Sequence, residues 1–193
     1  MESFTELDRE RYLSDPELIR FMAAVRERRH VHQPRDYALF SLLANTGMRP
    51  AEVRALTVAD CHLEGRAPWV RVVRLKKRKS TPEIDDLPIP CEVAEALSAH
   101  IHSAALSGVD VVFRIPARRM QRMFHDYRAT ARIRRINLYS LRHTAATRLY
   151  VATRNIRTVQ ALLGHERPDM TALYAHIPMA IQRELAATFP AIL

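Results

Sequence analysis

Hydrophobic positions in the first quarter of the chain recur at helical spacing. Residues 14–17 (Ser-Asp-Pro-Glu) have the pattern of a helix start, with a capping serine, a proline just inside and a glutamate three residues after the cap. Residues 17–28 are amphipathic, which predicts a helix on the surface of a core. Residues 35–46 are apolar on nearly every side, which predicts a buried helix that Gly47 ends.

The next segment predicts a sharp turn between two helices. Pro50 suits the first position of a new helix over residues 50–56, and it biases Arg49 toward an extended backbone. Arg49 is therefore expected at a rigid junction that holds its side chain still.

One stretch, residues 69–89, has the pattern of strands. We expect a β-hairpin there, with a turn over residues 76–86 whose basic tip is Lys76, Lys77, Arg78 and Lys79. Helical patterns then return over residues 91–105, 117–133, 140–153, 158–165, 168–177 and 179–189. The prediction is a mainly α fold with a small antiparallel β-sheet (α+β), in a single domain over residues 1–193.

The charge balance is the part of the composition that says most about possible partners. Thirty Lys and Arg against 21 Asp and Glu give a formal net charge of +9, which attracts polyanions and nucleic acid first among them. The alternative is that this charge serves solubility alone. Cys61 and Cys91 form no CxxC pair, so we interpret them as reduced packing residues and expect neither a metal nor a cofactor.

No apolar run approaches the length of a membrane span, and the charged start of the chain is unlike a signal peptide. We therefore expect a cytoplasmic protein that does not bind membranes.

Four segments stand out when they are taken together. They are TGMRPAEV from Thr46, the basic tip with Lys76, YSLRHTAATRLY from Tyr139, and LLGHERPDMTALYAHI, which ends at Ile177. Their order and spacing resemble the tyrosine recombinase (phage integrase) family. Taken singly, each has an ordinary explanation: an arginine can cap a helix, a tyrosine can pack in a core, and a KKRK cluster can be a solvated turn.

The resemblance implies a role for each matching residue. Tyr174 would be the nucleophile, Arg49, Arg142 and His165 would surround the scissile phosphate, and Lys76 would approach the leaving oxygen. Lys77 remains an alternative to Lys76. These residue types suit the chemistry because guanidinium groups bind two oxygens of an anionic phosphate together, and a lysine can protonate a poor leaving group.

One position departs from the family pattern. The family usually has histidine three residues before the second arginine, and this chain has Tyr139 there. A tyrosine can donate a hydrogen bond to a phosphate oxygen, but it is a poor base at neutral pH. We hypothesise that Tyr139 serves only in phosphate binding, and that His165 or water takes the proton of Tyr174.

The resemblance covers the catalytic domain only, without the helical domain that usually precedes it, as in short bacterial recombinases that invert DNA. It implies a site-specific recombinase or integrase that forms a 3′-phosphotyrosine. A DNA-binding regulator derived from a recombinase and a topoisomerase-IB-like enzyme stay open as alternatives. Without the helical domain, the chain would contact the DNA duplex from one side only and make fewer phosphate contacts. We therefore expect its DNA binding to be sensitive to salt and to need cooperative assembly or an accessory DNA-binding protein.

The implied partner is double-stranded DNA in the bacterial nucleoid, held by a homotetramer on paired sites, with a monomer when free. Residues 178–193 form an expected C-terminal helical tail, in which Ile181, Leu185, Phe189 and Leu193 recur at helical spacing. This tail needs an apolar groove, either on its own domain or on the neighbouring protomer.

Overall fold

A computed structural model of the chain describes residues 11–74 and 83–164. Within these ranges the fold is mainly helical with a small sheet, as the hydrophobic pattern predicts. The elements in chain order are α1 (Asp15–Glu27), α2 (Gln33–Thr46), α3 (Pro50–Ala55), the 3-10 turn η1 (Val58–Asp60), β1 (Cys61–His62), β2 (Trp69–Arg74), β3 (Glu83–Pro88), α4 (Cys91–Ser103), α5 (Ala117–Thr130), α6 (Ser140–Thr153) and α7 (Ile156–Leu163).

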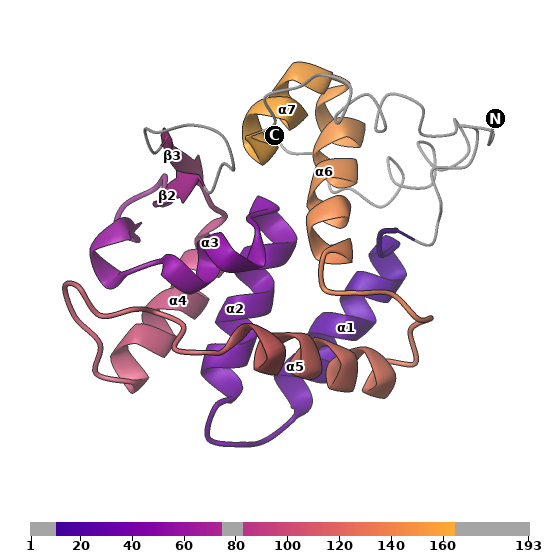
Figure 1. Ribbon diagram of the computed structural model, residues 1–193, viewed down its shortest axis with the longest axis horizontal. Coiled ribbons are helices and arrows are strands. Elements are labelled where there is room, and N and C mark those ends of the chain that lie inside the picture. The colour runs from indigo at the N-terminus through magenta and orange to yellow at the C-terminus, as the bar shows by residue number, and fades with distance from the viewer. Residues whose placement is uncertain (1–10, 75–82, 165–193) are drawn as a thin grey trace.

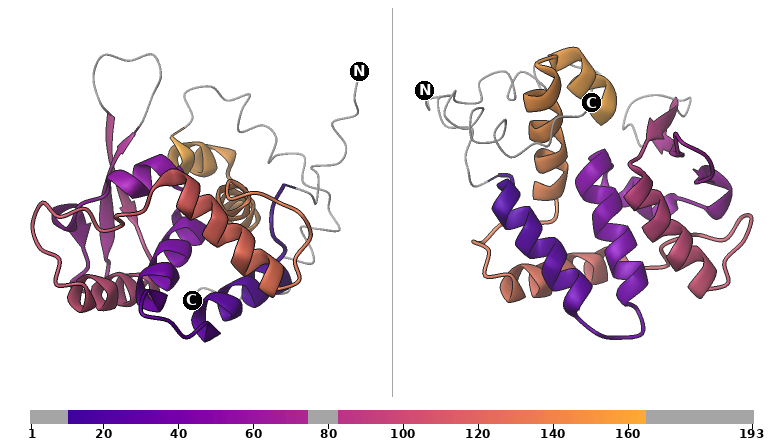
Figure 2. Two further views of the ribbon diagram at one scale, coloured as in Figure 1. Left: turned by 60° about the horizontal axis from the view of Figure 1, so that its bottom comes forward. Right: turned by 180° about the vertical axis from the view of Figure 1, so that it is seen from behind.

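Helix α2 forms the centre of the molecule. It contacts α1, α3, α4 and α6, and it runs between these helices near the middle of the ribbon (Figures 1 and 2). Leu39, Phe40 and Leu42 are completely buried on different sides of this helix, which confirms the prediction of a buried helix from its apolar composition. The sheet and α3 lie on one side of α2, and α6 with α7 lies on the other (Figure 1).

The sheet is antiparallel, with strand order β1-β2-β3. In β2, Val70 and Val72 point into the core while Arg71 and Val73 are exposed, so the strand alternates as a half-buried strand should. The sequence predicts the hairpin but not β1, because two residues are too short to leave a periodic pattern.

The start of the third strand is also a correction. Residues 83–86 were expected in the turn, yet β3 begins at Glu83 and pairs with β2 along its whole length. The acidic residues of β3 disfavour a strand in the sequence, but two of their carboxylates are bound by arginines of the neighbouring strand β2. Arg71 Nε donates to Asp86 Oδ1 at 3.0 Å, and Arg74 Nε donates to Asp85 Oδ2 at 2.6 Å. Cross-strand ion pairs of this kind allow acidic residues within a strand.

Local backbone chemistry sets the ends of the later helices. Helix α5 ends at Thr130, earlier than expected, and Arg132 just beyond it has a positive φ of 52° that a helix does not allow. Helix α7 begins at Ile156, earlier than expected, because the Asn155 side chain accepts hydrogen bonds from the first free backbone N–H groups. The predicted helices over residues 168–177 and 179–189 lie outside the described residues.

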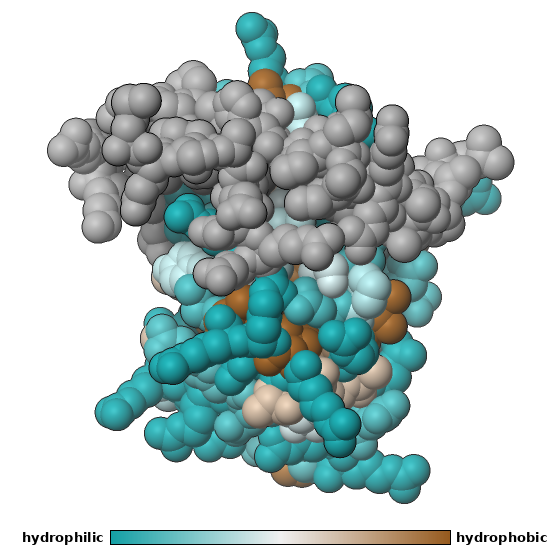
Figure 3. Space-filling model, turned by 90° about the vertical axis from the view of Figure 1, so that its right-hand side faces the viewer, coloured by the Kyte–Doolittle hydropathy of each residue, from teal (hydrophilic) through white to brown (hydrophobic). Residues whose placement is uncertain are grey.

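The surface fits this arrangement. Of the residues that Figure 3 colours by hydropathy, most on this face, the right-hand side of Figure 1, are hydrophilic, with a small hydrophobic area among them. Cys91 is exposed rather than buried, so its assignment as a packing residue was wrong; it begins α4 on the outside of the fold. Within the described residues, no helix is long and apolar enough to span a membrane.

Candidate active site

The turn between α2 and α3 places Arg49. The Thr46 hydroxyl donates to Leu42 O at 2.7 Å and accepts from the backbone N–H of Met48 at 3.3 Å. Gly47 ends α2 in the left-handed conformation, with φ of 63°, and an added Cβ would lie 3.1 Å from Leu163 Cδ2. A side chain at this position would be strained and crowded, so glycine is required. Arg49 then has the predicted extended backbone, with φ of −68° and ψ of 144°.

Glu52 orients the Arg49 side chain. Its Oε1 accepts from Arg49 Nη1 at 2.8 Å, and its Oε2 accepts from the Arg49 backbone N–H at 2.7 Å. The Glu52 side chain is 0% exposed, whereas the Arg49 side chain retains 27% of its accessible surface. A buried carboxylate that holds both ends of one arginine fixes that arginine while leaving it open to an anion from solvent.

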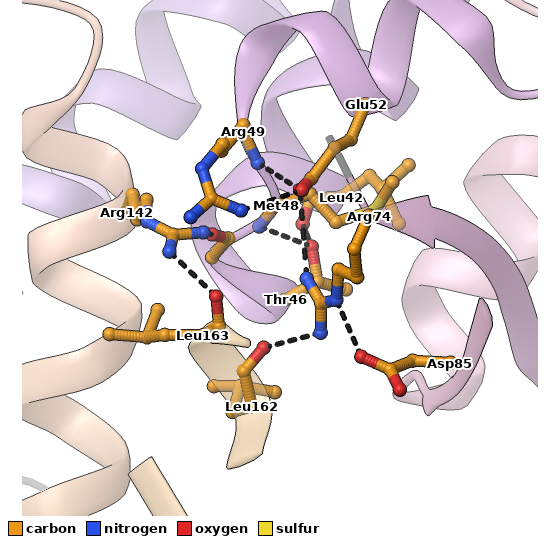
Figure 4. Close-up of polar contacts among 11 residues, drawn as sticks. Leu42, Thr46, Met48, Arg49, Glu52, Arg74, Asp85, Arg142, Leu162 and Leu163 are labelled. Carbon is orange, nitrogen blue, oxygen red and sulfur yellow. Dashed lines mark hydrogen bonds and ion pairs between the residues drawn. The ribbon is translucent and has the colours of Figure 1, made fainter. Parts of the chain in front are cut away.

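Arg142 reaches the same turn from α6. Its Nη1 donates to Gly47 O at 2.5 Å, and its Nη2 donates to Leu163 O at 2.8 Å. Figure 4 shows the Arg49 and Arg142 guanidinium groups on the same side of the α2–α3 turn. Two arginines that lie far apart in the sequence are thus held around Gly47, as the motifs predict.

Arg74 lies deeper in the same network. It is 2% exposed, and its Nη2 donates to Leu162 O at 2.8 Å while its Nε donates to Asp85. Its Nη1 lies 3.6 Å from Glu52 Oε2, as an ion pair. The guanidinium therefore contacts β3, α3 and the end of α7 at once (Figure 4).

Tyr139 lies directly before α6, one turn ahead of Arg142, and is 51% exposed. Its backbone N–H donates to Asn137 Oδ1 at 2.9 Å. Among the residues that the structure describes, none forms a hydrogen bond with the Tyr139 hydroxyl. The side chain is therefore accessible to a ligand from solvent.

Of the six predicted site residues, the structure describes Arg49, Tyr139 and Arg142. The other three, Lys76, His165 and Tyr174, lie outside the described residues, so their roles remain predictions. No cluster of three or more His, Cys, Asp or Glu suited to a metal ion occurs in the described parts of the chain.

The sequence reasoning missed two residues of this network. Glu52 lies within the TGMRPAEV segment and Arg74 within the strand pattern of residues 69–89, and neither was given a structural role. A signal for each was present: Glu52 follows Arg49 by three residues at a helix start, where such a glutamate accepts the capping N–H. Arg74 takes the inward position after Val70 and Val72, where a charged group must find partners.

Comparisons with known proteins identify the family of the chain. The model of the phage integrase family matches residues 11–180, most of the chain. The chain belongs to the phage integrase family. A tyrosine recombinase of Pseudothermotoga lettingae is 34% identical over 148 residues, and XerC of Neisseria meningitidis serogroup B is 30% identical over 151 residues. Each match covers 74% of this chain, but the chain spans about half the length of these relatives, 50% and 48%.

Solved structures of the family have the same fold. XerA recombinase matches with a TM-score of 0.72 and 27% identity, over 91% of this chain and 64% of that one. XerH bound to its palindromic difH substrate matches with a TM-score of 0.78 and 21% identity, over 94% of this chain and 54% of that one. The catalytic domain of bacteriophage HP1 integrase matches over 93% of this chain and 95% of that one, with a TM-score of 0.64 and 19% identity. The mainly α fold with a small sheet is therefore that of integrase catalytic domains.

Next to Arg142, His143 makes stability depend on pH. Burial lowers its pKa, and the positive charges of Arg11 and Arg142 lower it further. The unfolded chain, with a histidine pKa of about 6.5, then binds more protons than the native state as the pH falls. The stability that His143 contributes is thus complete above that pH and is lost as the pH drops below it.

We predict that His143→Gln weakens this pH dependence. Urea unfolding at about pH 7.5 and about pH 5.5 should show a smaller loss of unfolding free energy in the variant than in the wild type. His125→Gln, which alters an exposed histidine on α5, should lose as much as the wild type. An unchanged loss in His143→Gln would contradict the effect of its burial.

Proposed function

We propose that this chain is the DNA-cleaving domain of a site-specific recombinase, which breaks and rejoins DNA through a covalent phosphotyrosine. The observation that carries the proposal is the joint anchoring of Arg49 and Arg142 at the Gly47 turn. Arg142 and Gly47 are 95 residues apart in the chain, and the buried hydrogen bond between them is 2.5 Å long. Two fixed guanidinium groups suit the non-bridging oxygens of a phosphodiester, where charge grows during in-line attack.

In the proposed cleavage step, the Tyr174 oxygen attacks phosphorus and the bond from phosphorus to the 5′ oxygen breaks. Arg49 and Arg142 stabilise the charge that develops, and His165 or water takes the phenolic proton. Lys76 donates a proton to the 5′ oxygen as it leaves. The products are a 3′-phosphotyrosine and a free 5′-hydroxyl.

Rejoining reverses these events. The 5′-hydroxyl of another strand attacks the phosphotyrosine, the bond from phosphorus to Tyr174 breaks, and the phenol regains a proton. The covalent intermediate retains the energy of the broken phosphodiester, so the exchange needs no ATP.

Double-stranded DNA is the proposed substrate. Helix α5 exposes Arg118, Arg119 and Arg122, and its first turn contains no acidic residue, which suits contact with phosphates. The net charge of +9 acts in the same direction. Two family members of similar fold, XerH and the Tn1549 integrase, were solved with their DNA substrates or transposon ends.

Assembly follows from strand exchange. We propose a homotetramer on two paired sites, a monomer without DNA, and action in the bacterial cytoplasm at the nucleoid, with an accessory DNA-binding protein where one-sided binding is too weak. Sedimentation of the protein with and without paired sites tests the assembly, and a single protomer per duplex at saturation would contradict it.

The first prediction from this proposal concerns the nucleophile. Wild-type protein incubated with nicked duplexes taken from the DNA that flanks the gene should form a heat-stable protein–DNA adduct. Tyr174→Phe should form none, because it lacks the attacking oxygen, but should bind the same DNA. Denaturing electrophoresis with labelled DNA detects the adduct.

The outcomes separate the rival functions. An absent adduct on every flanking duplex, with DNA binding intact, would favour a DNA-binding regulator. An adduct that only reseals its own duplex would favour topoisomerase-like relaxation. An adduct that transfers to a second duplex supports recombination.

The second prediction concerns Tyr139, which we propose donates a hydrogen bond to the scissile phosphate and takes no proton. Tyr139→Phe should slow cleavage at saturating DNA by about 10- to 100-fold, as expected for a hydrogen bond to a charged group. Tyr150→Phe, which removes a hydroxyl from the same helix, is the matched control and should cleave normally. Tyr139→His should remain active, and abolished cleavage in that variant would argue against so simple a role.

A further inference from the structure

Arg74 occupies the last position of β2 and points inward, where its side chain has no exposed surface. A charged group in such a place is stable only when its surroundings satisfy it. Here three segments supply its partners. Asp85 of β3 accepts a hydrogen bond from Nε at 2.6 Å, and Leu162 O of α7 accepts one from Nη2 at 2.8 Å. Nη1 forms no hydrogen bond with the described residues and is compensated by the ion pair with Glu52 of α3 at 3.6 Å.

The end of α7 depends on these polar contacts because its apolar support is small. Its two buried side chains, Val159 and Leu163, form a small cluster with Ala146 of α6, and only the partly buried Leu162 packs against the main core. The last carbonyls of a helix have no partner within the helix. In α7, Arg74 binds the carbonyl of Leu162, and Arg142 binds that of Leu163.

Gly164 adds a close fit at the same place. It ends α7 with φ of 59°, and an added Cβ would lie 3.0 Å from Arg74 Nε. The backbone of Gly164 therefore packs directly against the Arg74 guanidinium, and this contact adds to the hydrogen bond between β2 and α7.

Each segment that Arg74 joins leads to a candidate catalytic residue. Glu52 holds Arg49, and the chain continues from Gly164 directly into His165. Lys76 follows Arg74 by two residues. No other described arginine forms an ion pair with both α3 and β3 and a hydrogen bond with the end of α7.

We propose that Arg74 is a positioning residue for DNA cleavage, which fixes Glu52 and the last turn of α7 relative to one another. It does not touch the phosphate; it acts through Glu52 on Arg49 and through Leu162 on the segment that precedes His165. This inference rests on the proposed recombinase function. Arginine is required because its planar fork reaches three acceptors in different directions, whereas a lysine ammonium is a single point charge.

The same pair of strands supplies a matched control. Arg71 is also paired with an aspartate of β3, Asp86, but both side chains of that pair are about half exposed. An exposed pair of this kind contributes little to stability or positioning. Comparing Arg74 with Arg71, and Asp85 with Asp86, separates the effect of position from the loss of a cross-strand ion pair.

The test combines hydrogen exchange with cleavage kinetics on the full chain. Arg74→Lys should quicken amide exchange over residues 50–55 and 156–164 by about fivefold or more, because local opening becomes easier. It should slow single-turnover cleavage at saturating nicked DNA by about 10- to 100-fold, the usual effect of misplaced catalytic groups, with the Kd for DNA within about threefold. Arg71→Lys should change neither.

A second variant keeps the test decisive if Arg74→Lys does not fold. Asp85→Asn weakens the hydrogen bond to Arg74 but leaves the buried guanidinium in place. It should show the same changes as Arg74→Lys, only smaller, and Asp86→Asn should show none. Unchanged exchange in Arg74→Lys or Asp85→Asn, or a loss confined to the Kd, would overturn the proposal. If the wild type forms no adduct, the proposed function fails, and hydrogen exchange alone still decides whether Arg74 holds α3 and α7 together.

Discussion

The buried carboxylate of Glu52 is the constraint on which the rest of the site depends. With its side chain 0% exposed, it has lost almost all contact with water, and an unpaired charge in that position would cost several kcal/mol. Arg49 satisfies it through one backbone and one side-chain hydrogen bond, and Arg74 faces it at 3.6 Å. The need to pair one carboxylate thus fixes a solvent-facing arginine and a buried one in the same place.

Arg74, the buried arginine, connects Glu52 to the helices on the other side of the molecule. Arg74 binds the end of α7, and Arg142 binds the next carbonyl of that helix together with Gly47 O. The α2–α3 turn, the hairpin, α6 and α7 therefore meet in one polar network, although the buried side chains of α7 belong to a small cluster apart from the main core and only Leu162 packs against that core. Preorganisation of this kind is what electrostatic catalysis requires, because fixed donors do not have to reorient as charge develops.

Much of this arrangement was predictable where local chemistry decides the backbone. Glycine readily adopts the left-handed conformation that ends a helix, and proline has a fixed φ that suits a helix start. The end of α2 at Gly47, the start of α3 at Pro50 and the extended Arg49 therefore followed from the sequence. The resemblance of the motifs implies that Arg142 and Arg49 act on the same phosphate, and in the structure Arg142 binds the carbonyl of Gly47, two residues before Arg49. The catalytic roles of all six predicted site residues stay predictions.

The rest depends on tertiary contacts that a local pattern does not contain. The start of β3 was placed too late because Asp85 and Asp86 disfavour a strand unless Arg74 and Arg71 of the neighbouring strand bind their carboxylates. Strand β1 is too short to show a period. Neither Glu52 nor Arg74 had a predicted structural role, and their burial results from the packing of α3, β2 and α7 around them.

Single-turnover cleavage by Glu52→Gln tests the central claim most directly. Glutamine nearly preserves the shape of the side chain but removes the charge, so it weakens the hold on Arg49 and leaves Arg74 with less compensation. The account predicts that the folded variant cleaves saturating nicked DNA on the order of 10- to 100-fold more slowly than the wild type, with a Kd for DNA within about threefold. Glu95→Gln, on the exposed face of α4, should cleave normally. A Glu52→Gln protein that cleaves as fast as the wild type would contradict the claim that this carboxylate organises the site.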